Sequence, residues 1–288
     1  MTRNKKWIAI FLLPGVALFA YIFLASLLVL ITTSFTDWTI AGKLSFIGIK
    51  NYVDLFTADK GYLTALKNTI VWIFLQSTIH VLFGTMVALI LAKKHWYSNA
   101  MRTVFFIPNI ISSAALGMLF LCILNPQFGL INNLIKKING DFNVNWFMDP
   151  KTAFLSVTLT WLPYAGLVTI LVISEMSSIS DEIIEAAKVD GATPLQADLY
   201  IVLPLMRNII GTSTVLAATS MLQKLDIIMM TTSGGPGVRT MNMPMYLYQT
   251  VFSNNNFGLA NAQGVLLILL GVLSLVIIRK LYRMDDED

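Results

Sequence analysis

The sequence is poor in the residues on which enzyme chemistry depends. One cysteine and two histidines occur among 288 residues, so an intrachain disulfide and a cysteine metal cluster are excluded. Cys122 falls within an apolar run, where we expect a small, buried hydrophobic side chain. The pattern G-x-x-x-x-G-K-[ST] does not occur either, so the chain has no P-loop with which to hold the phosphates of ATP.

Charged residues are also scarce. They make up 12% of the chain, and hydrophobic residues make up 56%, whereas a soluble domain carries about 25% charged residues. The mean hydropathy is +0.70. These values indicate a membrane protein. The net charge of +4 does not indicate nucleic-acid binding, because no basic run is interleaved with exposed aromatic residues.

Six apolar runs are each long enough to cross a bilayer, whose core of about 30 Å needs about 20 residues of helix. The first run is too long for a secretory signal, so we expect a retained helix. Prolines 14, 108 and 163 are expected to kink the spans that contain them. The sequence therefore predicts one all-α transmembrane domain over residues 1–288, with six spans at about 7–33, 68–92, 103–124, 152–174, 208–231 and 259–278.

The distribution of basic residues predicts the orientation. With both termini in the cytoplasm, Lys and Arg are about twice as dense in the inner segments as in the outer ones, as the positive-inside rule requires. The longest inner segment is then 175–207. Among the outer segments, Ile47–Leu66 and Leu130–Ile138 have the spacing of short helices on the membrane surface. The glycines and proline of 231–237 predict a sharp turn.

The inner segment 175–207 is a polar island in an apolar chain. Ser180 can cap a first helix, Gly191 permits a break, and Thr193-Pro194 suits the start of a second helix. We therefore expect a helix–turn–helix. Two consecutive alanines, Ala186 and Ala187, would leave a shallow notch for another protein. The alternative is a solvated connector between two spans.

Specific motifs in this island carry a resemblance. Glu185-Ala186-Ala187, Asp190-Gly191-Ala192 and Leu203-Pro204 resemble the EAA loop of permease subunits in binding-protein-dependent ABC importers. Thr232-Ser233-Gly234-Gly235-Pro236 resembles the carbohydrate-uptake branch, above all its first, larger, maltose-type permease of a heterodimeric pair. The resemblance covers most of the chain from about residue 50. Asp198 departs from it, because the family usually has an aromatic residue there, one that would pack into the ATPase cleft.

The resemblance implies a type I ABC importer permease fold and a set of partners. These are a second homologous permease, a cytoplasmic ATPase dimer, an extracellular solute-binding protein and a sugar. The ATPase dimer would bind ATP and Mg, and this chain would hold no cofactor. It also implies the plasma membrane of a prokaryote, and no nucleic acid. The residues expected to couple the chain to the ATPase are Glu185, Ala186, Ala187, Asp190 and Gly191.

Candidate solute contacts come from both physics and the resemblance. Ionisable groups within a span are costly unless they face protein or water, so Lys224 and Asp226 either line a polar path or form a structural pair near the interface. In the family, sugar contacts lie just before the Gly-Gly-Pro turn, after the third-span proline and in the aromatic part of the fourth span. The predicted pathway residues are Asn109, Ser113, Trp161, Tyr164, Gln223, Lys224 and Asp226.

Several alternatives remain at this point. His80, one turn after Gln76, suits a hydrogen-bonded helix contact better than a proton relay, and Asn261 and Gln263 also suit interhelical hydrogen bonds. The solute could be a glycerol phosphate or an anionic saccharide. An ion-coupled secondary transporter would need intramembrane acids, of which only Asp226 qualifies, and a membrane-embedded enzyme lacks a catalytic constellation.

Overall fold

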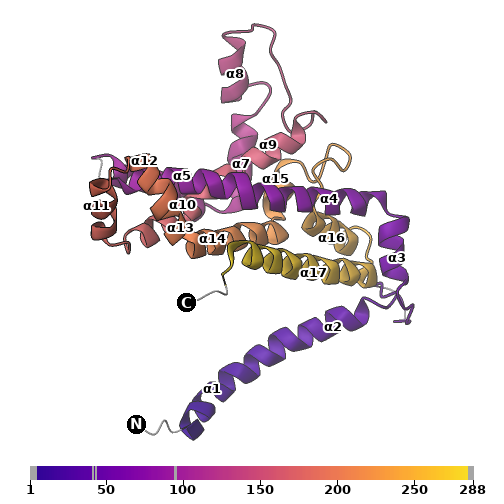
Figure 1. The fold of residues 1–288 in the computed structure, drawn as a ribbon. Helices are drawn as coiled ribbons and strands as arrows, with labels where there is room; N and C mark the ends of the chain where they lie inside the picture. The colour runs from indigo at the N-terminus through magenta and orange to yellow at the C-terminus, as the bar shows by residue number, and fades with distance from the viewer. Residues whose placement is uncertain (1–4, 41, 43, 94–95, 285–288) are drawn as a thin grey trace. The chain divides into compact units, whose positions relative to one another are not determined.

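The computed structural model describes residues 5–40, 42, 44–93 and 96–284, and no β-strand occurs in these residues. They form two compact units, which are treated separately. The first contains Met1–Lys60 and Leu247–Leu269. The second contains Gly61–Tyr246 and Leu270–Asp288. Figure 1 shows the helices of both units along the chain.

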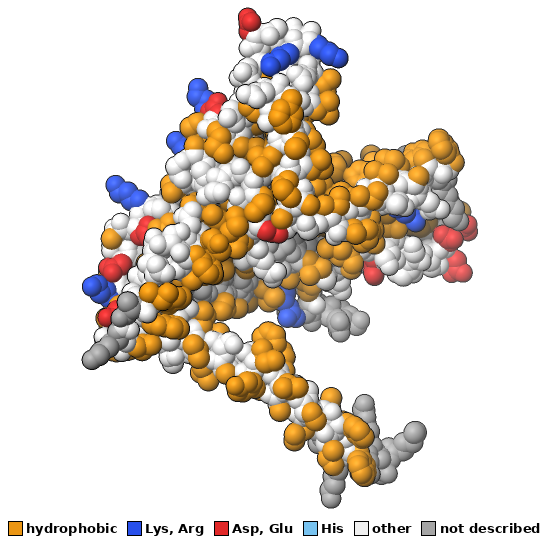
Figure 2. Space-filling model, turned by 180° about the vertical axis from the view of Figure 1, so that it is seen from behind, with side chains coloured by type: hydrophobic (Ala, Val, Ile, Leu, Met, Phe, Trp, Pro, Cys, Tyr) orange, Lys and Arg blue, Asp and Glu red, His pale blue; other side chains and the backbone are white. Residues whose placement is uncertain are grey.

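The first unit begins with one long apolar helix. It consists of α1 (Lys5–Phe19), a π-helical turn at Ala20–Leu24, and α2 (Ala25–Thr33). The apolar window within Ile10–Thr33 contains no buried residue, and hydrophobic side chains cover this helix in Figure 2. A helix that is apolar on all sides suits lipid or a partner helix, as expected for the first span.

Polar side chains tie the last helix of the chain, α17 (Phe257–Tyr282), to other parts of the first unit. The Asn261 amide donates to the Thr33 hydroxyl at 2.6 Å. The Gln263 amide donates to the Thr250 hydroxyl at 3.0 Å. The hydrogen bonds expected for Asn261 and Gln263 are therefore confirmed.

The second unit is built around α5 (Val81–Ala92), α10 (Ala165–Met176) and α14 (Arg207–Ser220), which lie side by side in Figure 1. Helices α5 and α10 cross at Gly84. The Thr169 hydroxyl donates to the Gly84 carbonyl at 3.0 Å, and a Cβ atom on Gly84 would lie 2.7 Å from Cβ of Val168. Only glycine permits so close an approach.

A cluster of aromatic rings fills the core of this unit. Trp72 is fully buried, stacks on Phe154 at 4.6 Å between ring centroids, and meets Trp161 edge-on at 4.6 Å. The Trp72 indole N–H donates to the Thr158 hydroxyl at 2.8 Å. These contacts fix the position of the Trp161 ring. The other helices of the two units are α3 (Lys50–Thr57), α4 (Lys60–Leu75), α6 (Ser98–Ile110), α7 (Ser113–Ile123), α8 (Leu130–Lys136), α9 (Ala153–Leu159), α11 (Asp181–Val189), α12 (Pro194–Ala197), α13 (Leu203–Leu205), α15 (Asp226–Thr231) and α16 (Met243–Phe252).

Among the described residues, four helices are long and apolar enough to cross a membrane without a sharp bend: Ile10–Thr33, Lys60–Ala92, Ala153–Met176 and Phe257–Tyr282. They correspond to the first, second, fourth and sixth predicted spans. The second begins earlier than predicted, at Lys60, so only α3 remains of the surface helix expected over Ile47–Leu66. The count rises to six if each of two bent helix pairs is one span.

The third predicted span, 103–124, is not a continuous helix. Helices α6 and α7 meet at 105°. Pro108 lies near the end of α6 and lacks a backbone N–H. Ile111 and Ser112 then adopt extended backbone angles, and the Ser112 hydroxyl caps α7 by accepting from the N–H of Ala115 at 3.2 Å. The proline was expected to kink this span, but the structure contains a full break.

The fifth predicted span, 208–231, is interrupted within its length. A 70° bend at Met206, between Pro194–Leu205 and Arg207–Gln223, precedes the span. The helix then stops inside the span at Lys224, whose ψ is 82°. The Lys224 carbonyl, no longer bonded within a helix, accepts from the Asn242 amide at 2.6 Å. A membrane helix tolerates such a break where a side chain satisfies the freed group.

The outer segments follow the sequence prediction in part. Helix α8 lies within the expected range and projects from the rest of the second unit in Figure 1. The turn after α15 is also confirmed, since Ser233, Gly234 and Gly237 have positive φ. Cys122 is exposed on α7, so the expectation of a buried cysteine is wrong.

Candidate functional site

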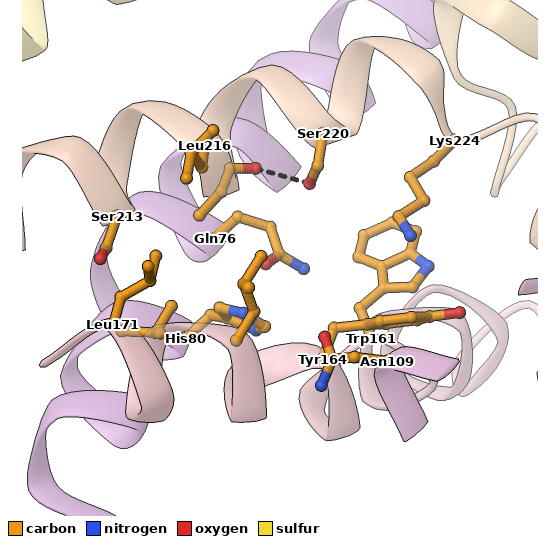
Figure 3. A pocket seen from close by; sticks show the side chains of 13 residues that line it. Gln76, His80, Asn109, Trp161, Tyr164, Leu171, Ser213, Leu216, Ser220 and Lys224 are labelled. Atoms are coloured by element: carbon orange, nitrogen blue, oxygen red, sulfur yellow. Dashed lines mark hydrogen bonds between the residues drawn. The ribbon is translucent and has the colours of Figure 1, made fainter. Parts of the chain in front are cut away.

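A cavity of about 200 Å³, lined by both polar and apolar side chains, lies within the second unit. Figure 3 shows side chains from the α4–α5 helix, α6, the segment before α10, α10 itself and α14 converging on it. Apolar side chains such as Leu171 and Leu216 complete the wall. The polar and aromatic residues that line it are Gln76, His80, Asn109, Trp161, Tyr164, Ser213, Ser220 and Lys224.

Irregular helix segments supply most of these side chains. Gln76 and His80 lie in a π-helical turn between α4 and α5. Asn109 follows Pro108 at the end of α6, and Tyr164 belongs to the 3₁₀ turn Leu162–Tyr164. Lys224 lies at the break after α14. Single π-helical turns and broken helices recur at functional sites in membrane proteins, and here they surround one space.

Several buried polar atoms at the cavity have no hydrogen-bond partner in the part of the chain that the structure describes. They are Nδ1 of His80, Nδ2 of Asn109, Nε1 of Trp161 and Oγ of Ser213. Leaving a buried polar atom unpaired costs about 1–3 kcal/mol, so native proteins seldom do so. Their convergence on a cavity indicates a site for a polar ligand or water.

A second cavity of about 270 Å³ shares Ser220 and Lys224 with the first. Ser113, Gln223 and Asp226 also line it. The Ser113 hydroxyl donates to the Asp226 carboxylate. The Lys224 ammonium lies 4.0 Å above the centroid of the Tyr164 ring, an arrangement that favours a cation. The two cavities therefore meet at Lys224.

The structure brings all seven predicted pathway residues together at these two cavities. Sequence reasoning did not assign Gln76, His80, Ser213 or Ser220 to the pathway, although all four lie in apolar spans and their polarity was the available signal. The hydrogen bond expected of His80 is not found at its Nδ1 atom, which is buried without a partner among the described residues.

The island between α10 and α14 forms the predicted helix–turn–helix. Ser180 caps α11, accepting from the N–H of Glu182 at 3.2 Å. Thr193 caps α12 and forms a reciprocal capping box with Gln196. Gly191 between the helices has a φ of 87°, which glycine adopts without strain. We call residues 180–197 the hairpin.

The hairpin presents most of the predicted coupling residues on its surface. Glu185, Ala186, Asp190 and Gly191 are exposed. Ala187 is 7% exposed, so the notch expected from two alanines has only one of them at the surface. Val189 beside them is 87% exposed, an apolar side chain that a partner protein could cover.

Asp198, the position that departs from the family pattern, is engaged within the chain. Its carboxylate forms an ion pair of 3.0 Å with the ammonium of Lys93, just after α5. Asp198 is 17% exposed and Lys93 is 50% exposed. The pair joins the segment after α12 to the end of α5.

Comparison with known proteins identifies the family. Residues 80–283 match the family described as binding-protein-dependent transport system inner membrane component. The chain is 28% identical over 293 residues to the probable ABC transporter permease protein YurN of Bacillus subtilis, covering all of both chains. It is 28% identical over 288 residues to the multiple sugar-binding transport system permease protein MsmF of Streptococcus mutans, covering 96% of this chain and 95% of that one.

A solved structure shares the fold. The chain aligns with a TM-score of 0.85 and 21% identity to a chain of a bacterial alginate ABC transporter in complex with an alginate pentasaccharide-bound periplasmic protein. The alignment covers 99% of this chain and 96% of the other. Since the family match spans well over half of the sequence, the chain belongs to the inner membrane components of binding-protein-dependent transport systems and is an ABC transporter permease, not an enzyme.

Proposed function

We propose that the chain is one permease subunit of an ATP-driven importer that takes up saccharides, above all oligosaccharides, across a prokaryotic plasma membrane. An extracellular solute-binding protein would deliver the sugar, and a second homologous permease would complete the pathway. A separate cytoplasmic ATPase dimer would bind ATP and Mg and drive the cycle. No chemical step falls to this chain.

The cavity lined by Trp161, Tyr164 and several polar side chains is the observation that carries this proposal. Its aromatic faces, Trp161 and Tyr164, suit the apolar C–H patches of a sugar ring. The unpartnered atoms of His80, Asn109 and Ser213 suit sugar hydroxyls, which both donate and accept hydrogen bonds. The printed name of the Streptococcus relative, a multiple sugar-binding system, supports the same class of solute.

The hairpin supports coupling to a separate ATPase. The chain has no P-loop, so an ATP-driven cycle needs a docking surface for the subunit that hydrolyses ATP. Glu185 and Ala186 are exposed on α11, and Asp190 and Gly191 are exposed in the turn between the two capped helices. The α10 helix leads directly into this hairpin, so a displacement there reaches the segments that line the cavity.

Uptake by the complete importer tests the proposal. We expect ATP-dependent accumulation of labelled oligosaccharides in proteoliposomes. Asn109→Ala should reduce it at least about fivefold, and so should Trp161→Phe, which keeps an aromatic ring but removes the N–H donor, because loss of a hydrogen bond of this kind costs about 1–3 kcal/mol. Trp96→Phe is the matched control, because Trp96 is 95% exposed and lies outside the cavity. Uptake driven by an ion gradient without ATP would contradict the proposal, and so would normal uptake by both cavity variants.

A further inference from the structure

Lys224 carries a positive charge at the cavity without a negative group in contact with it. The ion pair between Lys93 and Asp198, in the part of the chain that the structure describes, does not involve Lys224. The Lys224 ammonium instead lies over the Tyr164 ring, 4.0 Å from its centroid. Figure 3 shows its side chain extending from the end of α14 toward Tyr164 and Trp161.

The nearest acid in the sequence, Asp226, is held in other contacts. Its carboxylate accepts the Ser113 hydroxyl and, at 3.0 Å, the backbone N–H of Ile227. Asp226 lines the second cavity together with Lys224, but no ion pair joins the two side chains. The Asp226 carboxylate is bonded to Ser113 on α7, whereas the Lys224 ammonium lies over the Tyr164 ring.

Two further donors accompany this ammonium. Nδ2 of Asn109 and Nε1 of Trp161 line the same cavity and have no acceptor among the described residues. Both groups can only donate. A neutral sugar would satisfy the two N–H donors, but it would leave Lys224 without a direct ion pair. A partly buried charge at membrane depth is costly unless an opposite charge pairs with it.

We propose that the solute is a saccharide with an anionic group, such as a uronate or a sugar phosphate, and that Lys224 binds this group with help from Asn109 and Trp161. The inference rests on the proposed import of a saccharide through this cavity. Lys224 is then the residue that selects for charge, and the aromatic rings and the remaining polar groups bind the neutral part of the sugar.

Matched ligands separate charge from shape. Four disaccharides, each as the neutral sugar, the uronate oxidised at C6 and the 6-phosphate, would be titrated against the complete importer in nanodiscs without the solute-binding protein. We expect at least one anionic form to bind at least about tenfold more tightly than its neutral parent, a ratio equal to about 1.4 kcal/mol. Lys224→Gln should abolish the preference, and Lys224→Arg should retain it. Lys137→Gln, at an exposed lysine of the α8 region, is the control.

The outcomes distinguish this inference from the function on which it rests. Equal binding of neutral and anionic forms by the unmodified importer would overturn the inference and leave saccharide import standing. A preference that survives Lys224→Gln would also overturn it, since another group would then select the charge. If no sugar of either kind bound, both the inference and the assignment of the cavity to saccharides would fall.

Discussion

Replacing Asp198 with alanine should loosen the hairpin from the rest of the second unit. The change removes the ion pair of 3.0 Å that joins the segment after α12 to the end of α5. Lys93 is half exposed, so water can hydrate its ammonium once the partner is gone. The cost is therefore smaller than the 3–5 kcal/mol or so that follows the loss of one member of a fully buried pair.

The exposed fractions set the magnitude. Exposed pairs contribute about 0.2–1 kcal/mol, and Asp198, at 17% exposed, is shielded more than a typical surface acid. We therefore expect about 1 kcal/mol. This free energy corresponds to about a fivefold larger population of the locally open state.

Hydrogen exchange of the backbone amides over 195–202 measures this opening, because exchange follows the population of the open state. Asp198→Ala should accelerate it about fivefold, and Lys93→Ala should have a similar effect. The double variant should be no faster than either single one, since the pair contributes only once. Asp190→Ala, which removes an exposed acid of the same hairpin without an ion pair, is the control. Additive effects of the two single changes, or unchanged exchange, would refute the reasoning.

Three further predictions concern coupling, packing and transport. Gly191→Val should destabilise the turn by about 1–2 kcal/mol, because valine disfavours a φ of 87°. The ratio of uptake to ATP hydrolysis should fall while membrane insertion stays normal. An unchanged ratio would count against docking through the hairpin. Gly84→Val should prevent close packing of α5 on α10, because a Cβ atom at Gly84 would already lie 2.7 Å from Cβ of Val168. The yield of assembled complex should fall. Gly140→Val, at a glycine where a Cβ atom would have no neighbour within 4 Å, should leave the yield unchanged, and equal yields of the two variants would contradict close packing of α5 and α10 at Gly84. Gln223→Ala and Lys224→Ala should reduce uptake more than assembly, and normal transport kinetics in both would remove these residues from the pathway.

Local structure in the hairpin followed from the sequence. The caps at Ser180 and Thr193 and the positive φ of Gly191 depend on neighbours within a few residues. Such neighbours are visible in the sequence itself. The apolar runs likewise predicted the four unbroken membrane helices, because length and hydropathy suffice for them.

The helix breaks could not be placed from the sequence because distant groups stabilise them. The break at Lys224 depends on the Asn242 amide, which lies beyond the following turn. The partner of Asp198 is Lys93, in a different loop. The lack of a hydrogen-bond partner for Nδ1 of His80 could not be predicted either, because it depends on which helices pack against His80. The sequence supplied the polar residues of the cavity, but only the fold brought them to one place.

The glycine crossing between α5 and α10 has a mechanical consequence. The hairpin is attached to this pair of helices at two points, through the chain that leaves α10 and through the Lys93–Asp198 ion pair at the end of α5. The two helices are in close backbone contact at Gly84. A displacement of the hairpin should therefore move both helices together as one rigid body. Gln76 and Tyr164 would then move together with α5 and α10. The cavity would widen or narrow where these two helices face α14.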